Sequence, residues 1–206
     1  MACISDRRCS DGCIFSNANN KNKKTKKRMT LITSAQKRIW TIFNPDEEKL
    51  LRHPVLPFDF AAYSKKEIDE LVRHMRAMMV RYNGIGLSAN QIGLNMNVFV
   101  CQLPSPDGKG YTGKFYAVFN PRITSRGGRK IPDSEGCLSV PGYYGDIDRS
   151  ERVTLEGFDR NNRPLTVKAD GLLAAIFQHE TDHLSGKVFL DRAHHIIQVD
   201  SIKEKK

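Results

Sequence analysis

The stretch 170–184 constrains the fold of this 206-residue chain more than any other part of the sequence. Its apolar residues recur at helical spacing and form one stripe, and His179 and His183 continue that stripe one helical turn apart. A helix with two imidazoles on its apolar face must have other elements packed around that face. We therefore expect a central, largely enclosed helix over about 170–184.

The same helix carries a pattern typical of metal-dependent hydrolases. Two histidines four residues apart can bind one divalent ion, and Glu180 beside them can reach a water molecule next to that ion. A single inward histidine is usually an ordinary core residue. A histidine pair with an interposed glutamate rarely arises by chance, and it predicts a metal site.

A third ligand has to come from elsewhere, and its position distinguishes enzyme classes. Metzincins would have a further histidine six residues after His183, where this chain has Phe189. A thermolysin-like site needs an acid on a later helix, and the downstream acids lie on no predicted helix: Asp191, Asp200 and Glu204. The missing ligand is therefore expected upstream, where the thiol of Cys137 is the best candidate.

The remaining pattern indicates an α+β fold. Ser64 and Glu67 form a capping box at the start of a second, N-terminal helix over about 65–82, and a methionine-rich apolar stripe follows them. Between 84 and 171 the chain favours strands, with a predicted hairpin of 153–155 against 165–167. We expect antiparallel strands packed around the central metal-binding helix.

Charge divides the chain into unequal parts. The net charge is +10, but residues 1–28 contain eight basic and two acidic side chains and so account for most of it. Residues 1–41 are interpreted as a basic extension, 42–192 as the catalytic domain and 193–206 as a short polar tail. Three cysteines of the extension (Cys3, Cys9 and Cys13) lack a zinc-binding spacing, and Met29 is an alternative start.

Taken together, three motifs resemble those of the peptide deformylase family. They are Gly84-Ile-Gly-Leu-Ser-Ala-Asn-Gln91, Glu135-Gly-Cys-Leu-Ser139 and Gln178-His-Glu-Thr-Asp-His183, in that order. Weaker sequence similarities to the family extend over most of residues 42–192. Ser88 departs from the family, which more often has alanine at this place.

The resemblance implies removal of the formyl group from formyl-methionine at the start of nascent polypeptides. By motif match, Cys137, His179 and His183 would hold the metal, and Glu180 would act as general base and then acid. Gln91 and the backbone N–H of Leu138 would stabilise the oxyanion. The substrate would be bound by Gly84, Ile85, Gly86, Gly136, Leu172 and Ala175, with Tyr143 or Tyr144 at the rim.

The resemblance also carries expectations about cofactor and partners. Fe²⁺ would be the native ion, with Zn²⁺, Ni²⁺ or Co²⁺ able to replace it. The partners would be formyl-Met nascent peptides and, transiently, the ribosome, with no membrane and no specific nucleic acid. A monomer in the cytoplasm of a bacterial or phage-infected cell is expected, or an organellar protein if residues 1–28 are a transit segment.

Two other functions compete with this interpretation. A zincin-type metallo-endopeptidase would cleave internal peptide bonds and would not need Cys137. A basic RNA- or ribosome-binding protein with a structural metal would have four protein ligands and no role for Glu180.

Overall fold

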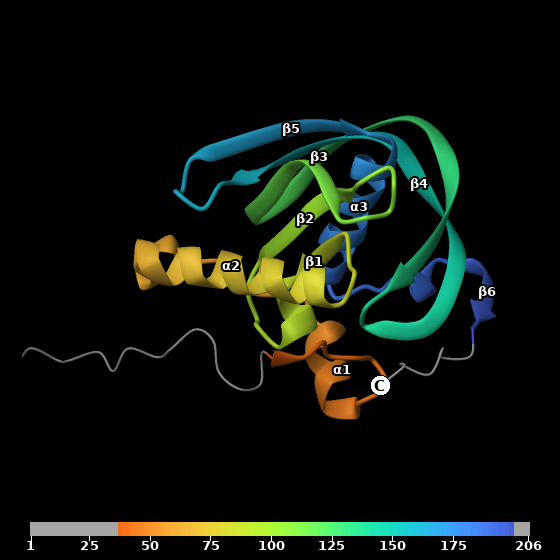
Figure 1. Ribbon diagram of the computed structural model, residues 1–206, viewed down its shortest axis with the longest axis horizontal. Coiled ribbons are helices and arrows are strands. Elements are labelled where there is room, and N and C mark those ends of the chain that lie inside the picture. Colours follow the sequence, from red (N-terminus) through yellow and green to blue (C-terminus); the bar gives the residue numbers. More distant parts are fainter. Residues whose placement is uncertain (1–36, 200–206) are drawn as a thin grey trace, which may run out of the picture.

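The computed structural model describes residues 37–199, in which an antiparallel sheet surrounds a central helix (Figure 1). The expected α+β fold is confirmed. The helices are α1 (Pro45–Leu51), α2 (Lys65–Arg81) and α3 (Gly171–Leu184). The strands are β1 (Gly86–Ser88), β2 (Val98–Pro104), β3 (Tyr111–Cys137), β4 (Val140–Phe158), β5 (Pro164–Asp170) and β6 (His194–Gln198).

Helix α3 is the predicted central helix, and it contacts β1 to β5. The Phe177 side chain of this helix is fully buried and packs against Phe99 of β2 and Tyr116 of β3. These aromatic contacts fix how the helix is turned within the sheet. They therefore determine where the side chains one turn further along, including the two histidines, must point.

Helix α2 packs on β1 and β2 and forms a second part of the core. The predicted capping box is present, because Ser64 and Glu67 exchange hydrogen bonds at the N-terminus of the helix. The methionine stripe is buried as expected, with Met75 and Met79 fully inaccessible. Helix α2 thus supports β1 from the side away from α3.

Strands β3 and β4 are much longer than the short runs that the sequence predicts. They pair along all of β4 and along β3 from Phe119 onward, while the start of β3 pairs with β2. The pairing of β3 with β4 contains several bulges, one of them next to Gly128, which has a φ of +74°. Figure 1 shows the pair curving away from β5 and continuing down toward β6. This curvature brings Cys137, at the end of β3, to the same part of the molecule as α3.

The two ends of the β4 strand pair with different neighbours. Near its end, Leu155 pairs with Val167 of β5, which confirms the predicted hairpin. Near its start, Asp146 pairs with His194 of β6, a strand within the segment interpreted as a polar tail.

The basic run and the tail cysteines lie outside the described residues. No helix in the described part of the chain has the length and apolar character to cross a bilayer.

Candidate active site

Three potential metal ligands converge between α3 and the end of β3. The Cys137 sulfur lies 3.1 Å from Nε2 of His183, and that nitrogen lies 3.2 Å from Nε2 of His179. A tetrahedral divalent ion holds sulfur and nitrogen ligands roughly 3.3–3.6 Å apart. The spacing and the donor set therefore fit a single metal ion bound by these three side chains.

Both imidazoles present Nε2 to the cluster, and a hydrogen bond on the opposite side of the ring explains this for His179. Nδ1 of His179 lies 2.8 Å from a carboxylate oxygen of Glu135, so a proton on Nδ1 leaves the Nε2 lone pair free to bind a metal. Burial lowers the pKa of His183 well below its usual range and keeps that ring neutral. Burial also acts to lower the pKa of His179, but hydrogen bonds with Cys137 and Glu135 outweigh it and raise this pKa well above its usual range. His183 is thus in the neutral form that a metal requires, whereas a metal would have to displace a proton from His179.

A chain of ion pairs holds the Glu135 carboxylate in place. Arg149 is 4% exposed and donates to both Glu135 oxygens, at 2.6 and 2.8 Å. The same guanidinium donates to Asp182, which also pairs with Arg192. Burial acts to raise the pKa of Glu135, but hydrogen bonds with Arg149 and His179 outweigh it and lower this pKa to about 2. Glu135 therefore stays a carboxylate and holds the imidazole in place.

The Asp182 side chain takes part only in these ion pairs among the described contacts, which gives it a structural role. Arg149, in contrast, is a site residue that the sequence patterns do not reveal. The only available signal is a single arginine in a strand segment, and its importance depends on a partner 14 residues away.

Glu180 lies beside the ligand cluster and is 3% exposed. One of its carboxylate oxygens accepts a hydrogen bond of 2.6 Å from the Ser88 hydroxyl. Burial raises the pKa of Glu180 to about 7, although His179 and Ser88 act against this rise. A side chain with this pKa can both accept and return a proton near neutral pH.

Glycine at position 86 is required by this arrangement. A Cβ atom added to Gly86 would overlap the Glu180 carboxylate. The close approach of β1 to α3 thus depends on a residue without a side chain. The same strand supplies Ser88, so β1 both makes room for Glu180 and hydrogen-bonds to it.

Gln91 is held so that its amide faces the cluster. It lies in the short 3₁₀ helix η3 (Ala89–Ile92), and its Oε1 accepts a hydrogen bond of 2.8 Å from the backbone N–H of Ser88. Its Nε2 is directed toward Ser139 and Cys137, at 3.2 and 3.6 Å. Leu138 lies in the tight turn between β3 and β4, directly after Cys137. Gln91 and Leu138 therefore each bring an N–H group close to the thiol.

A cavity of about 790 Å³ opens beside the cluster. Strand β1 borders it and is an edge strand, since among the described residues it pairs only with β2. Tyr143 and Tyr144 contribute to the lining as well. Of the predicted site residues, His183 is buried outside the lining; the others line the cavity, namely Gly84, Ile85, Gly86, Gln91, Gly136, Cys137, Leu138, Leu172, Ala175, His179 and Glu180.

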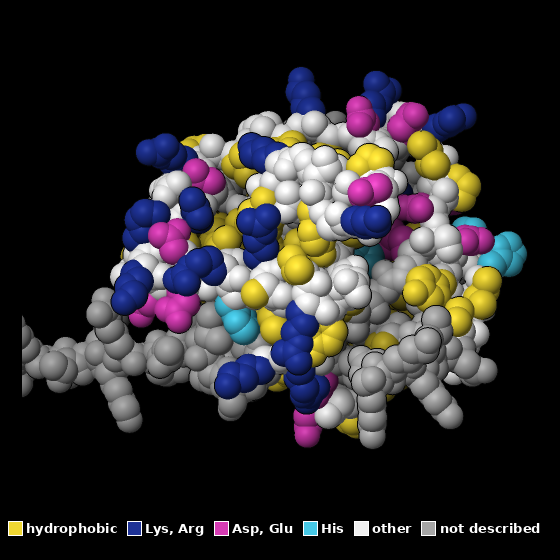
Figure 2. Space-filling view, in the orientation of Figure 1, with side chains coloured by type: hydrophobic (Ala, Val, Ile, Leu, Met, Phe, Trp, Pro, Cys, Tyr) yellow, Lys and Arg dark blue, Asp and Glu magenta, His cyan; other side chains and the backbone are white. Residues whose placement is uncertain are grey.

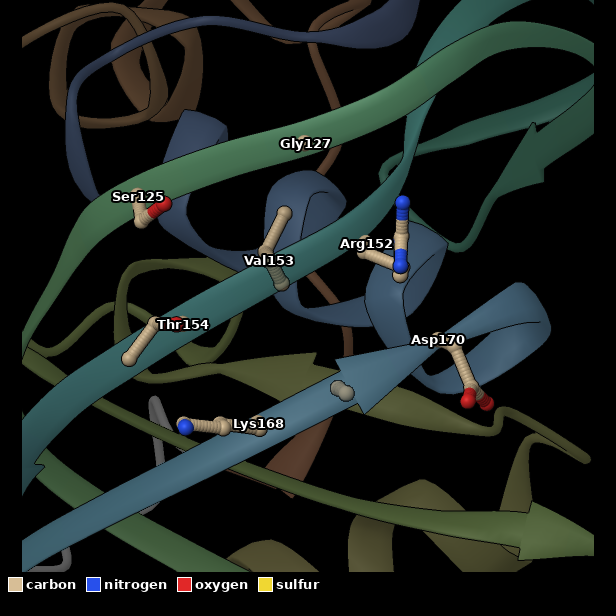
Figure 3. A pocket seen from close by; sticks show the side chains of 8 residues that line it. Ser125, Gly127, Arg152, Val153, Thr154, Lys168 and Asp170 are labelled. Atoms are coloured by element: carbon tan, nitrogen blue, oxygen red, sulfur yellow. The ribbon is translucent and has the colours of Figure 1, made fainter.

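Another hollow, of about 340 Å³, lies over β3, β4 and β5 (Figure 3). Its lining includes the basic side chains of Arg152 and Lys168 and the opposite charge of Asp170. It contains no cysteine or histidine. The cavity beside α3, in contrast, is lined by Cys137, His179 and Glu180.

Comparisons with known proteins agree with this geometry. A family model for polypeptide deformylase matches residues 39–198. The peptide deformylase of Elusimicrobium minutum is 37% identical over 161 residues, which cover 77% of this chain and 90% of that protein.

Solved structures give the same result. A peptide deformylase from Synechococcus elongatus, in complex with actinonin, is 33% identical with a TM-score of 0.67, over 76% of this chain and 80% of that one. A class I type b peptide deformylase from Acinetobacter baumannii, bound to Met-Ala-Ser, is 25% identical with a TM-score of 0.69, over 80% and 99% of the two chains.

These matches do not favour the zincin-type endopeptidase, and the convergence of Cys137 with the two histidines argues against it independently. A purely structural metal would leave the buried Glu180 and the cavity unexplained. With its fold, its cavity and its relatives in agreement, the chain belongs to the polypeptide deformylase family, the metal-dependent hydrolases that remove the N-terminal formyl group from formyl-methionyl polypeptides.

Proposed function

We propose that Cys137, His179 and His183 hold the catalytic divalent ion of this deformylase. The support is the convergence of one sulfur and two Nε2 atoms at metal-ligand spacing, with the first imidazole oriented by Glu135. A mixed thiolate and imidazole set suits several transition metals. We propose Fe²⁺ as the native ion, with Zn²⁺, Ni²⁺ or Co²⁺ as replacements.

When bound, the ion supplies a Lewis acid that polarises the formyl carbonyl and makes water acidic enough to react near neutral pH. Glu180 then acts as the general base that takes the proton from the attacking water. Its pKa of about 7 also lets it return that proton to the departing amine. The Ser88 hydroxyl keeps the carboxylate directed to one side while it does so.

The negative charge that develops on the formyl oxygen needs hydrogen-bond donors. Gln91 is suited to this task because its Oε1 is anchored by the Ser88 backbone, which leaves Nε2 on the cavity side. The backbone N–H of Leu138, next to the thiol, is the second proposed donor. One such donor typically stabilises a transition state by about 3–4 kcal/mol.

The substrate is proposed to bind as an added strand along β1. The free edge of β1 borders the cavity, and Gly84, Gly86 and Gly136 leave room for a second backbone. The methionine side chain is proposed to contact Ile85, Leu172 and Ala175. Leu172 is 44% exposed, which is unusual for a leucine of a central helix and fits an apolar binding surface. The Acinetobacter baumannii relative binds Met-Ala-Ser, a peptide of this kind.

The setting of the reaction follows from the substrate. Formylated amino termini occur on nascent chains, so we propose a cytoplasmic monomer that meets the ribosome transiently. An organellar location is the alternative if residues 1–28 direct import.

The convergent Cys137, His179 and His183 cluster is the observation that carries this proposal. Its test is formate release from formyl-Met-Ala-Ser under anaerobic conditions, combined with metal analysis of the purified protein. We expect iron and activity to be lost together on exposure to oxygen. We also expect Co²⁺ or Ni²⁺ to restore the activity. Full activity in protein free of transition metals would contradict the proposal.

A further inference from the structure

A second group of potential metal ligands lies between β4 and β6, away from the catalytic cluster. Asp146, His194 and His195 each offer one ligand atom, and these atoms all lie within 4.8 Å of one another. Figure 2 shows histidine and acidic side chains together at the edge of the molecule where β6 lies. Within residues 37–199, only this group and the catalytic one bring three such side chains together.

The backbone explains why two consecutive histidines can face the same acid. In a regular strand, neighbouring side chains point to opposite faces. His195 instead has a φ of +50°, in the left-handed region that few residues other than glycine adopt. The two imidazole rings are consequently only 5.2 Å apart, centre to centre, although they belong to adjacent residues.

Strand pairing brings the acid to this histidine pair. Asp146 is the cross-strand partner of His194, next to a bulge in the pairing of β4 with β6. A carboxylate oxygen of Asp146 lies 3.6 Å from Nδ1 of His195, which is longer than a hydrogen bond. No other hydrogen bond or ion pair of the described chain engages these three side chains. All three groups are thus available to a ligand.

We propose that Asp146, His194 and His195 bind one divalent transition-metal ion of the kind that prefers imidazole, such as Zn²⁺ or Ni²⁺. Two nitrogens and one carboxylate oxygen form a donor set that these ions accept, with water completing the coordination. Ligand atoms around such an ion lie about 3.3 Å apart. The histidines are exposed and Asp146 is partly so, so side-chain rotation can bring the atoms to this separation.

A bound ion would link β4 to β6 and would act as a clamp between these two strands. Strand β6 is exposed along its whole length and pairs only with β4 among the described residues. The pairing includes Tyr143 with Gln198 and Tyr144 with Ile197, and both tyrosines line the catalytic cavity. An ion that links Asp146 to the histidines would hold β6 against the strand that carries this rim.

The test is a titration of the metal-loaded enzyme, with its catalytic site already filled, with Zn²⁺ in a calorimeter. Full-length wild type, the double variant His194→Ala/His195→Ala and the exposed control variant His53→Ala are compared. Wild type and His53→Ala should each bind one ion per chain more than the double variant. Equal numbers in all three proteins would overturn the proposal, whatever the total bound elsewhere on the chain.

A second measurement separates ion binding from the clamp. Hydrogen exchange of the amides of residues 194–198 should slow on addition of Zn²⁺ in wild type and stay unchanged in the double variant. Unchanged exchange in zinc-bound wild type would refute the clamp. Circular dichroism and formate release by the double variant check that its fold is intact, because neither histidine belongs to the catalytic cavity.

Discussion

The two histidine clusters of this protein use similar ligands in opposite surroundings. The cluster of Cys137, His179 and His183 is enclosed, and a hydrogen-bonded carboxylate orients its first imidazole. The group around Asp146 is open to solvent, and within residues 37–199 no further acid or amide supports its histidines. Ligand identity alone therefore does not make a catalytic centre.

What distinguishes the buried cluster is the set of groups around it. Glu180 has a pKa near neutrality because it is buried beside the ligands, and Gln91 directs an amide toward the same space. The cavity gives a peptide access to both. The exposed group has none of these features, so we expect it to bind an ion without catalysing a reaction.

The largest effect should follow removal of the thiol. Cys137→Ala leaves two imidazoles for the ion, and we expect loss of stoichiometric metal and of measurable formate release. Metal content by atomic absorption and the formate assay check this together. Cys101→Ala is the matched control: that cysteine is fully buried in the core, and its loss should leave metal content unchanged. Full activity in Cys137→Ala would show that the histidines suffice.

The next effect concerns the proposed oxyanion donor. Gln91→Glu keeps the oxygen that accepts from the Ser88 backbone but removes the N–H donor, so kcat should fall by about 10²–10³. Gln178→Glu is the control, since Gln178 is buried on α3 and hydrogen-bonds to Ser150 outside the cavity. It should lower thermal stability but change kcat little. A similar loss of kcat in both variants would argue against a specific role for Gln91.

A smaller effect is expected from the residue that orients His179. Glu135→Gln removes the charge that faces both His179 and Arg149, and we expect metal affinity to fall about 10–100-fold. Competition with a chelator measures this change. Glu156→Gln breaks an exposed ion pair with Arg122 and should not alter it. Unchanged affinity in Glu135→Gln would remove the proposed orienting role.

The smallest expected effect is on stability at acid pH, and it distinguishes loss of the fold from loss of catalysis. Glu47, which is 4% exposed and outside the lining of the catalytic cavity, accepts hydrogen bonds from Arg38 and from the Thr41 backbone, and these lower its pKa below 4.5. The unfolded chain binds this proton more readily, so the stability from Glu47 is present above about pH 4.5 and is lost as the pH falls further.

Glu47→Gln should therefore flatten the dependence of stability on pH below about 4.5 and leave activity at pH 7 unchanged. Urea unfolding at pH 3 to 7 measures the first effect, and the formate assay measures the second. A pH dependence identical to that of wild type would show that other acids control stability in acid.

Helices α2 and α3 could be predicted from sequence because their signals are local, whereas the short helix α1 was not predicted. The apolar stripe of 170–184 and the capping box at Ser64 depend on residues within a few turns of one another. The long arms of β3 and β4 could not be predicted. The β3 arm over 122–137 is polar and mostly exposed, and it is held by cross-strand hydrogen bonds instead of an alternating apolar pattern.

The site shows the same division. The histidines and Glu180 share one helical turn, so their spacing alone predicts that they meet. Arg149 meets Glu135 only because β3 and β4 pair in one particular register, and a shift of one residue would turn its side chain to the opposite face. That register cannot be read from a single sequence.

The most direct test of the central claim, that the buried cluster and Glu180 act together, is deformylation by Glu180→Gln. This variant keeps all three ligands, and rates of formate release from formyl-Met-Ala-Ser should be compared with wild type at equal metal content. We predict that the variant retains its metal while kcat/KM falls by at least about 10²–10⁴. A metal-loaded Glu180→Gln protein that deformylates the peptide at the wild-type rate would contradict the account.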